Sequence, residues 1–143
     1  MLKKFAAVAA AVSAIAVGGI AGLASPASAS VAGATCSKSG YHADGNVLYS
    51  TSGSQTYVSA YEWSIYGVPG STQNDVSVVL RKDVVGTDGT LHGYASGTEK
   101  YGYNYTDVRK YYAASLKLYG TFTFVFDVNN ATDPVCSDET PRF

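Results

Sequence analysis

The chain has few of the residues that most catalytic and metal sites use. Among its 143 residues there are two histidines, two cysteines and one tryptophan, and only 15% of the residues are charged. His42 and His92 are the only imidazoles, and no serine lies in a G-x-S-x-G elbow, so a serine-nucleophile site is not indicated. The two cysteines lack the C-x-x-C spacing and adjacent histidines of a zinc site. We therefore expect no enzyme, no cofactor and no metal site.

An excess of positive charge is also absent. The chain has 10 Lys and Arg against 11 Asp and Glu, which gives a formal net charge of −1 at pH 7. Because a nucleic-acid-binding domain carries a basic patch, we expect no nucleic-acid partner. The 46% of hydrophobic residues excludes a disordered chain and indicates a folded globule, and the length suits a single domain with its own core.

The first 29 residues have the organisation of a cleavable export signal. Lys3 and Lys4 form a positively charged start, and residues 5–23 are apolar. Residues 27–29 read Ala-Ser-Ala, a small-x-small cleavage sequence. An uncleaved membrane anchor is the alternative, because the apolar segment is just long enough to span a bilayer. The segment is rich in alanine and glycine, however, and no cluster of positive charge follows it, so we expect cleavage before Ser30.

The lysine pair, the alanine-rich segment and the absence of a lipobox cysteine resemble the signals of proteins exported by Gram-positive bacteria with GC-rich genomes. This resemblance covers residues 1–29 alone and implies a bacterial, secreted protein. We expect residues 1–29 to be removed and residues 30–143 to form one extracellular domain with no membrane attachment. Loss of Lys3 and Lys4 takes its formal net charge to −3.

Cys36 lies near the start of the expected mature domain and Cys136 near its end. An oxidising compartment favours a disulfide, and two cysteines allow only one pairing. A bridge that closes so long a loop typically stabilises a small domain by about 2 to 5 kcal/mol. We therefore predict that a Cys36–Cys136 disulfide ties the two ends of the domain side by side.

Most of residues 46–128 alternate between apolar and polar side chains, which is typical of half-buried antiparallel strands. The expected strands are residues 46–50, 57–66, 76–81, 91–96, 100–106 and 121–128. Turn signals occur at residues 44–45, 52–53, 68–70, 88–89, 96–97 and 120. This spacing predicts an all-β fold, a small antiparallel β-sandwich of about six to eight strands, with a small barrel as the alternative. Residues 30–39 are expected to be an arm held by Cys36.

In two segments, the expected secondary structure determines which side chains face the core. In residues 57–66, regular alternation places Tyr57 on the same face as Trp63 and leaves Glu62 facing solvent. Residues 107–119 fit either a helix that ends at Gly120 or a strand that places Leu118 in the core. We favour the strand, with a hairpin-like continuation through Gly120, because the surrounding chain is all strands.

Tyrosine is the abundant residue, and all 12 tyrosines lie in residues 30–143. The expected core side chains are Trp63, Ile65, Val76, Val78, Leu80, Phe122, Phe124 and Phe126. Tyr101, Tyr103 and Tyr105 share one face of an expected strand, and three aligned phenols would each need a buried partner if they pointed inward. We predict that these three tyrosines form an exposed recognition surface. The alternative is that they pack at the sheet rim and across strands.

These features favour a secreted, non-enzymatic β-domain that binds a glycan or a protein through exposed aromatics. The expected partner is cell-wall or extracellular polysaccharide, or a secreted protein. The alternative function is a proteinaceous inhibitor of a secreted hydrolase, which would present a rigid turn such as residues 68–70 to an active site. Residues 127–133 match only part of a calcium loop and are expected to form a polar turn.

Overall fold

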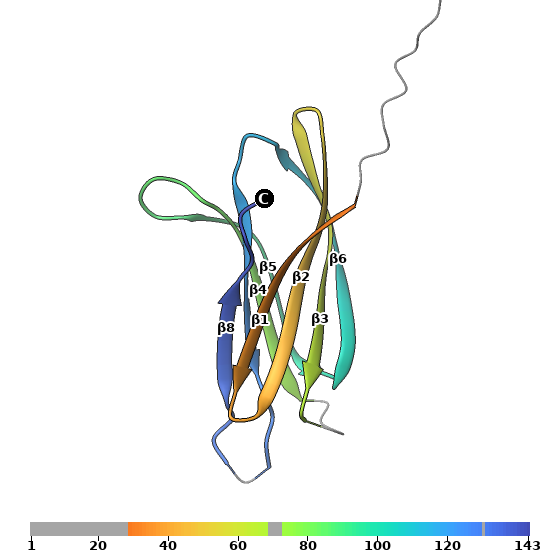
Figure 1. Cartoon of the computed structure of the whole chain (residues 1–143), viewed down its shortest axis with the longest axis vertical. Helices are drawn as coiled ribbons and strands as arrows, with labels where there is room; N and C mark the ends of the chain where they lie inside the picture. The colour runs from red at the N-terminus through yellow and green to blue at the C-terminus, as the bar shows by residue number, and fades with distance from the viewer. Residues whose placement is uncertain (1–28, 69–72, 130) are drawn as a thin grey trace, which may run out of the picture.

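The computed structural model describes residues 29–68, 73–129 and 131–143, which form two antiparallel sheets packed face to face (Figure 1). The strands are β1 (Ser30–Lys38), β2 (Tyr41–Ser52), β3 (Gln55–Tyr66), β4 (Asn74–Lys82), β5 (Gly89–Glu99), β6 (Gly102–Ala113), β7 (Leu118–Val125) and β8 (Val135–Glu139). Sheet A has the order β1-β2-β3-β6, and sheet B has the order β5-β4-β7-β8. The predicted all-β sandwich is confirmed. The expected signal lies outside the described residues, except for Ala29.

The core lies between the inward faces of the two sheets. Its largest fully buried side chains are Val47, Val58, Tyr61, Trp63 and Ile65 from sheet A and Val76, Val78, Leu80, Leu118, Phe122 and Phe124 from sheet B, together with Phe126. All the side chains assigned to the core from the sequence are buried. Burial of each large apolar side chain stabilises the fold by roughly 1.5 to 3 kcal/mol relative to exposure.

Two glycines that the sequence marks as turns lie inside strands instead. Gly45 lies in β2, where a Cβ atom would stand 2.3 Å from Cδ1 of Phe122. Gly120 lies in β7, where a Cβ atom would stand 2.8 Å from Cγ2 of Val47. In both places the missing side chain makes room for a core residue, so these glycines serve close packing rather than chain reversal. The turn predicted at residues 96–97 is also wrong, because both residues lie in β5.

The N-terminal segment is a strand rather than the expected arm. β1 pairs antiparallel with β2, and the chain turns between them at Ser39 and Gly40, whose φ angles are 55° and 84°. The inward residues of β1 include Ala32 and Ala34. Their small side chains make the apolar alternation weak, which is why the sequence does not predict this strand. β8 was not predicted either, because Cys136 is its one side chain packed against the core.

A bulge in β3 reverses the face expected for Tyr57. Leu48 of β2 pairs with Ala60, and its neighbour Tyr49 pairs with Val58, so Ser59 is an extra residue in β3. One inserted residue shifts the alternation to the other face. Val58 is therefore fully buried, and Tyr57 lies on the outer face of sheet A instead of beside Trp63.

Residues 107–113 form a strand, as favoured, but residues 114–117 form a turn. The Ala114 N–H donates to the Ser54 carbonyl at 2.8 Å, and the Leu116 N–H donates to the Ala113 carbonyl at 3.0 Å. The chain then crosses to sheet B, where Leu118 begins β7 and is buried as expected. The expected hairpin-like continuation is therefore wrong, because β6 and β7 belong to different sheets.

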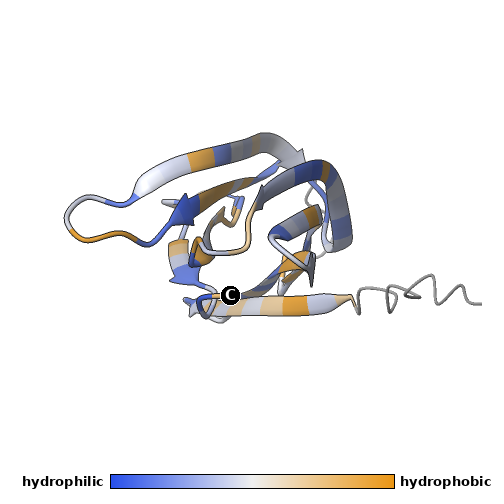
Figure 2. Cartoon of the chain, turned by 90° about the horizontal axis from the view of Figure 1, so that it is seen from above, coloured by the Kyte–Doolittle hydropathy of each residue, from blue (hydrophilic) through white to orange (hydrophobic). Residues whose placement is uncertain are grey.

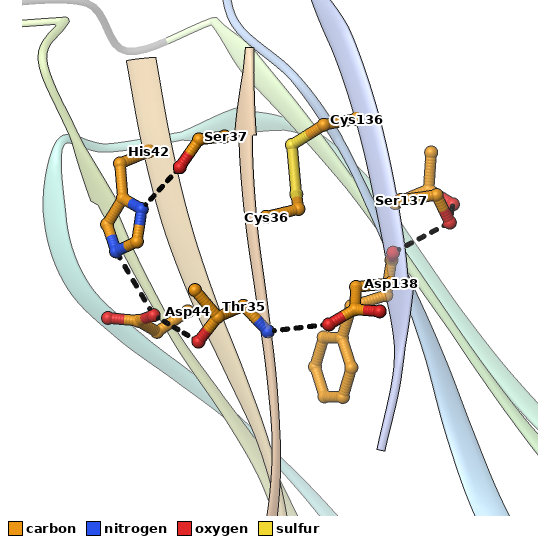
Figure 3. Close-up of a disulfide and its surroundings, with 10 residues drawn as sticks. Thr35, Cys36, Ser37, His42, Asp44, Cys136, Ser137 and Asp138 are labelled. Atoms are coloured by element: carbon orange, nitrogen blue, oxygen red, sulfur yellow. Dashed lines mark hydrogen bonds and ion pairs between the residues drawn. A yellow bond between two sulfur atoms is a disulfide. The ribbon is translucent and has the colours of Figure 1, made fainter. Parts of the chain in front are cut away.

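Cys36 in β1 and Cys136 in β8 form a disulfide, with their Cα atoms 5.9 Å apart (Figure 3). β1 and β8 are edge strands of different sheets, so the bond joins the two layers along one side of the sandwich. Beside it, the Thr35 N–H donates to Oδ2 of Asp138 at 3.0 Å. The predicted pairing and the closeness of the first and last strands are confirmed.

Candidate functional site

Three tyrosines follow one another at the β6 edge of sheet A, and we call them the tyrosine column. The exposed fractions of Tyr101, Tyr103 and Tyr105 are 47%, 63% and 64%. Asn104 and Thr106 pair with inward-facing residues of β3, so alternation directs Tyr103 and Tyr105 to the outer face. Tyr101 directly precedes the strand. The column is thus exposed, and its role in binding remains a prediction.

Glu62 fixes the middle of the column. The Tyr103 hydroxyl donates to Oε1 of Glu62 at 2.7 Å, across the pairing of β6 with β3. This hydrogen bond to the carboxylate raises the pKa of the Tyr103 phenol above its ordinary value. The Tyr103 ring is therefore held against rotation while most of its surface stays open to solvent. Carboxylate oxygens have further lone pairs, so Glu62 can also accept a hydrogen bond from a ligand.

Polar side chains of β1, β2 and β3 cover the part of this outer face that lies beside the column. We call them the polar platform, which comprises Thr35, Ser37, His42, Asp44, Asn46, Glu62 and Ser64. Strand register arranges the platform in rows that end at the tyrosine column. One row runs through Asp44 and Ser64 to Tyr103, and the next runs through Asn46 and Glu62 to Tyr105. Hydroxyl, amide, imidazole and carboxylate groups thus adjoin exposed aromatic rings.

Three platform residues are of the types found in a catalytic triad (Figure 3). The Ser37 hydroxyl lies 2.8 Å from Nδ1 of His42, and Nε2 of His42 lies 3.2 Å from Oδ1 of Asp44. A triad buries its aspartate and needs an oxyanion hole. Here the side chains of His42 and Asp44 are 40% and 38% exposed on an open sheet face. The sequence does not predict this cluster, because Ser37 comes beside His42 only through the turn at residues 39–40 and the pairing of β1 with β2.

The second histidine is partly buried and contacts a side chain of sheet A that faces the core. Nδ1 of His92 in β5 lies 3.0 Å from the Tyr61 hydroxyl of β3. Burial raises the pKa of the Tyr61 phenol far above its ordinary value, and the Tyr112 phenol adds to this effect. Burial also lowers the pKa of His92, with a smaller contribution from the positive charge of Lys110. This pair therefore belongs to the packing of the sandwich and not to the outer face of sheet A.

The outer face of sheet B has a shallow hollow of about 410 Å³. Its lining residues are Asp75, Val76, Ser77, Ala95, Ser96, Gly97, Thr123 and Val125. The hollow exists because the residues at its centre are small, and none of its lining side chains is aromatic. It therefore offers no aromatic ring on which a ligand could stack.

The loop between β4 and β5 projects from the sandwich and has a hydrophobic tip (Figure 2). Val85 is fully exposed, and Val84 is 38% exposed. The Val84 N–H donates to Oδ1 of Asp88 at 3.1 Å, and the Tyr119 hydroxyl donates to the other carboxylate oxygen. Of the turn proposed for an inhibitor, residues 68–70, Val68 is buried, and residues 69–70 lie outside the described residues.

Within the described ranges, no three His, Cys, Asp or Glu side chains converge in the manner of metal ligands. In the same part of the chain, no helix has the length and apolar character needed to cross a membrane. The polar turn expected at residues 127–133 contains a hydrogen bond from the Val128 N–H to Oδ1 of Asp133, and Asn130 lies outside the described residues. No protein-family model, no curated protein and no solved structure matches this chain.

Proposed function

We propose that residues 30–143 form a secreted, non-enzymatic domain that binds an extracellular or cell-wall polysaccharide through the outer face of sheet A. The observation that carries this proposal is the tyrosine column at the border of the polar platform. Tyrosine rings immobilise at low entropic cost and offer both an apolar face and a polar tip. The disulfide and the expected export signal support an oxidising, extracellular location.

The mixture of groups on this face suits a sugar better than a protein. A sugar ring has an apolar C–H face, which can stack on a phenol ring, and a rim of hydroxyls, which need hydrogen-bond partners. Asp44, Asn46 and Glu62 supply such partners within the rows that end at the tyrosines. The centre of a protein–protein interface is instead depleted of charged residues. The carboxylate of Glu62 at Tyr103 and that of Asp44 in the row that ends at Tyr103 therefore favour a hydroxyl-rich ligand.

A binding assay on insoluble polymers tests the proposal. The exported protein would be incubated with crystalline cellulose, chitin and purified peptidoglycan, and the bound fraction would be measured after washing. We expect one of these polymers to retain the wild type and to retain much less of the Tyr103→Ala variant. Val135→Ala is the matched control, because Val135 is 52% exposed but lies on β8 of sheet B. Retention by none of the polymers would contradict the proposal.

Inhibition of a secreted hydrolase is the second candidate function, and the loop between β4 and β5 favours it. Its tip presents the fully exposed Val85 to solvent, while Asp88 holds its base by two hydrogen bonds. A rigid loop with an apolar tip can enter the substrate pocket of an enzyme. A panel of secreted proteases and amylases discriminates the two functions. An inhibitor would form a one-to-one complex that Val85→Asp abolishes and Tyr103→Ala leaves intact.

A further inference from the structure

A second aromatic group lies on the same outer face as the tyrosine column. Tyr57 of β3 and Tyr111 of β6 pair directly across the two strands, and their ring centroids are 4.7 Å apart at an interplanar angle of 35°. Tyr111 is 65% exposed, which is as much as any residue of the column. The Tyr57–Tyr111 pair thus places an exposed ring, Tyr111, beside a partly buried one, Tyr57, on the outer face.

An irregularity in β3 puts Tyr57 on the outer face, to which plain alternation along β6 already directs Tyr111 together with Tyr103 and Tyr105. The register of β3 with β6 passes from Val58 opposite Lys110 to Ala60 opposite Asp107, and Arg109 between them has a φ of 52°. This bulge turns Val58 into the core and thereby turns Tyr57 outward.

A stretch of small and polar residues separates the pair from the column. At about 3.3 Å per residue, the step from Tyr105 to Tyr111 along β6 covers roughly 20 Å. Ala60 and Asp107 pair across the strands between them, and Nη2 of Arg109 lies 2.7 Å from Oδ2 of Asp107. Ala60 contributes only a methyl group to this stretch, and the exposed side chains of Asp107 and Arg109 offer hydrogen-bonding groups to a ligand that passes between the two aromatic groups.

We propose that the Tyr57–Tyr111 pair is a second subsite of the polysaccharide-binding face, and that the ligand is a linear polysaccharide which follows β6 across both subsites. This inference rests on the function proposed above. A ligand as short as a disaccharide reaches only one aromatic group, whereas a longer chain occupies both. Once one subsite is occupied, the contact with the second is intramolecular. The affinity therefore rises with chain length by more than the larger number of positions at which a longer chain can bind.

A length series of oligosaccharides tests the second subsite. Oligosaccharides from the disaccharide to the octasaccharide, prepared from whichever of cellulose, chitin and peptidoglycan retains the protein, would be titrated by calorimetry. For the wild type we expect the affinity to rise by about tenfold or more between the shortest and longest chains. Tyr111→Ala should keep the affinity for short chains and lose this rise. Tyr103→Ala should weaken binding at every length.

The outcomes distinguish a failure of the second subsite from a failure of the proposed polysaccharide binding. If the wild type binds oligosaccharides without length dependence, or if Tyr111→Ala leaves the length dependence intact, the second subsite is wrong while the proposed function stands. If none of the three polymers retains the wild type, the proposed function is itself contradicted. Tyr57→Ala serves as an independent variant should Tyr111→Ala fail to fold, and Val135→Ala should match the wild type at all lengths.

Discussion

The hydroxyl of Tyr103 donates a 2.7 Å hydrogen bond to Glu62, and this contact joins the tyrosine column to the polar platform. Because the two residues come from neighbouring strands of a disulfide-closed sandwich, a rigid sheet fixes their relative position. A preorganised ring loses little conformational entropy when a ligand stacks on it. The pair therefore supplies, in one place, an apolar face and an acceptor whose positions do not depend on the ligand.

The ionisation of Tyr103 should depend on Glu62. The hydrogen bond to the carboxylate favours the neutral phenol, so replacement by an amide should lower the pKa of Tyr103 toward the ordinary tyrosine value. The measurement is the ultraviolet difference titration of Glu62→Gln against wild type, with Tyr103→Phe used to identify the signal. An unchanged titration of Tyr103 would show that the hydrogen bond does not persist in solution.

Removal of the disulfide should weaken the fold without changing its strand content. The bond closes a loop with a sequence separation of 100 residues, and we expect Cys36→Ala together with Cys136→Ala to lower the free energy of unfolding by about 2 to 5 kcal/mol. Urea melts of the oxidised, reduced and doubly substituted proteins measure this. Equal midpoints for the three forms would mean that the bond contributes nothing to stability.

Stability should fall on mild acidification because of His92. In the folded state, burial lowers the pKa of this imidazole below its ordinary value of 6.5. The unfolded chain therefore binds more protons than the folded chain just below pH 6.5. The free energy of unfolding therefore decreases as pH falls through this range. Comparison of urea melts at about pH 7.5 and about pH 5 should show a smaller loss for His92→Gln than for wild type. An equal loss in both proteins would assign the acid sensitivity to other groups.

Gly45 should not tolerate a side chain. A Cβ atom at this position would stand 2.3 Å from Cδ1 of Phe122, and overpacking of this kind costs about 1 to 3 kcal/mol or more. We expect Gly45→Ala to lower the melting temperature markedly. Gly93→Ala is the control, because the nearest atom to its Cβ, the Val78 carbonyl oxygen, would lie 3.9 Å away. Similar melting temperatures for the two variants would contradict the packing role of Gly45.

Apolar alternation predicted the fold class and the core residues, because the large side chains of β3, β4 and β7 follow it closely. It could not predict β1, whose inward residues are alanines, or the outward position of Tyr57, which depends on the extra Ser59. Glycine in the sequence indicates either a turn or a site of close packing, and the two cannot be told apart locally. Gly40 reverses the chain, whereas Gly45 and Gly120 accommodate core side chains from the facing sheet.

The candidate site was predictable only in part. The alternation of Tyr103 and Tyr105 along one strand indicated exposure, but the platform depends on which strands are neighbours. Glu62 reaches Tyr103 because β6 pairs with β3, a connection between strands that are distant in the sequence. Local pattern carries no information about such pairing.

The dissociation constant of Tyr103→Ala for the polysaccharide that retains the wild type, measured together with its melting temperature, tests the central claim most directly. If Tyr103 is a recognition residue, the substitution should weaken binding by about tenfold, which corresponds to 1.4 kcal/mol, and leave the melting temperature nearly unchanged. Unchanged binding would contradict the account. So would a loss of stability of about 3 kcal/mol or more, because that is the cost of truncating a packed aromatic and would make the tyrosine column a structural feature.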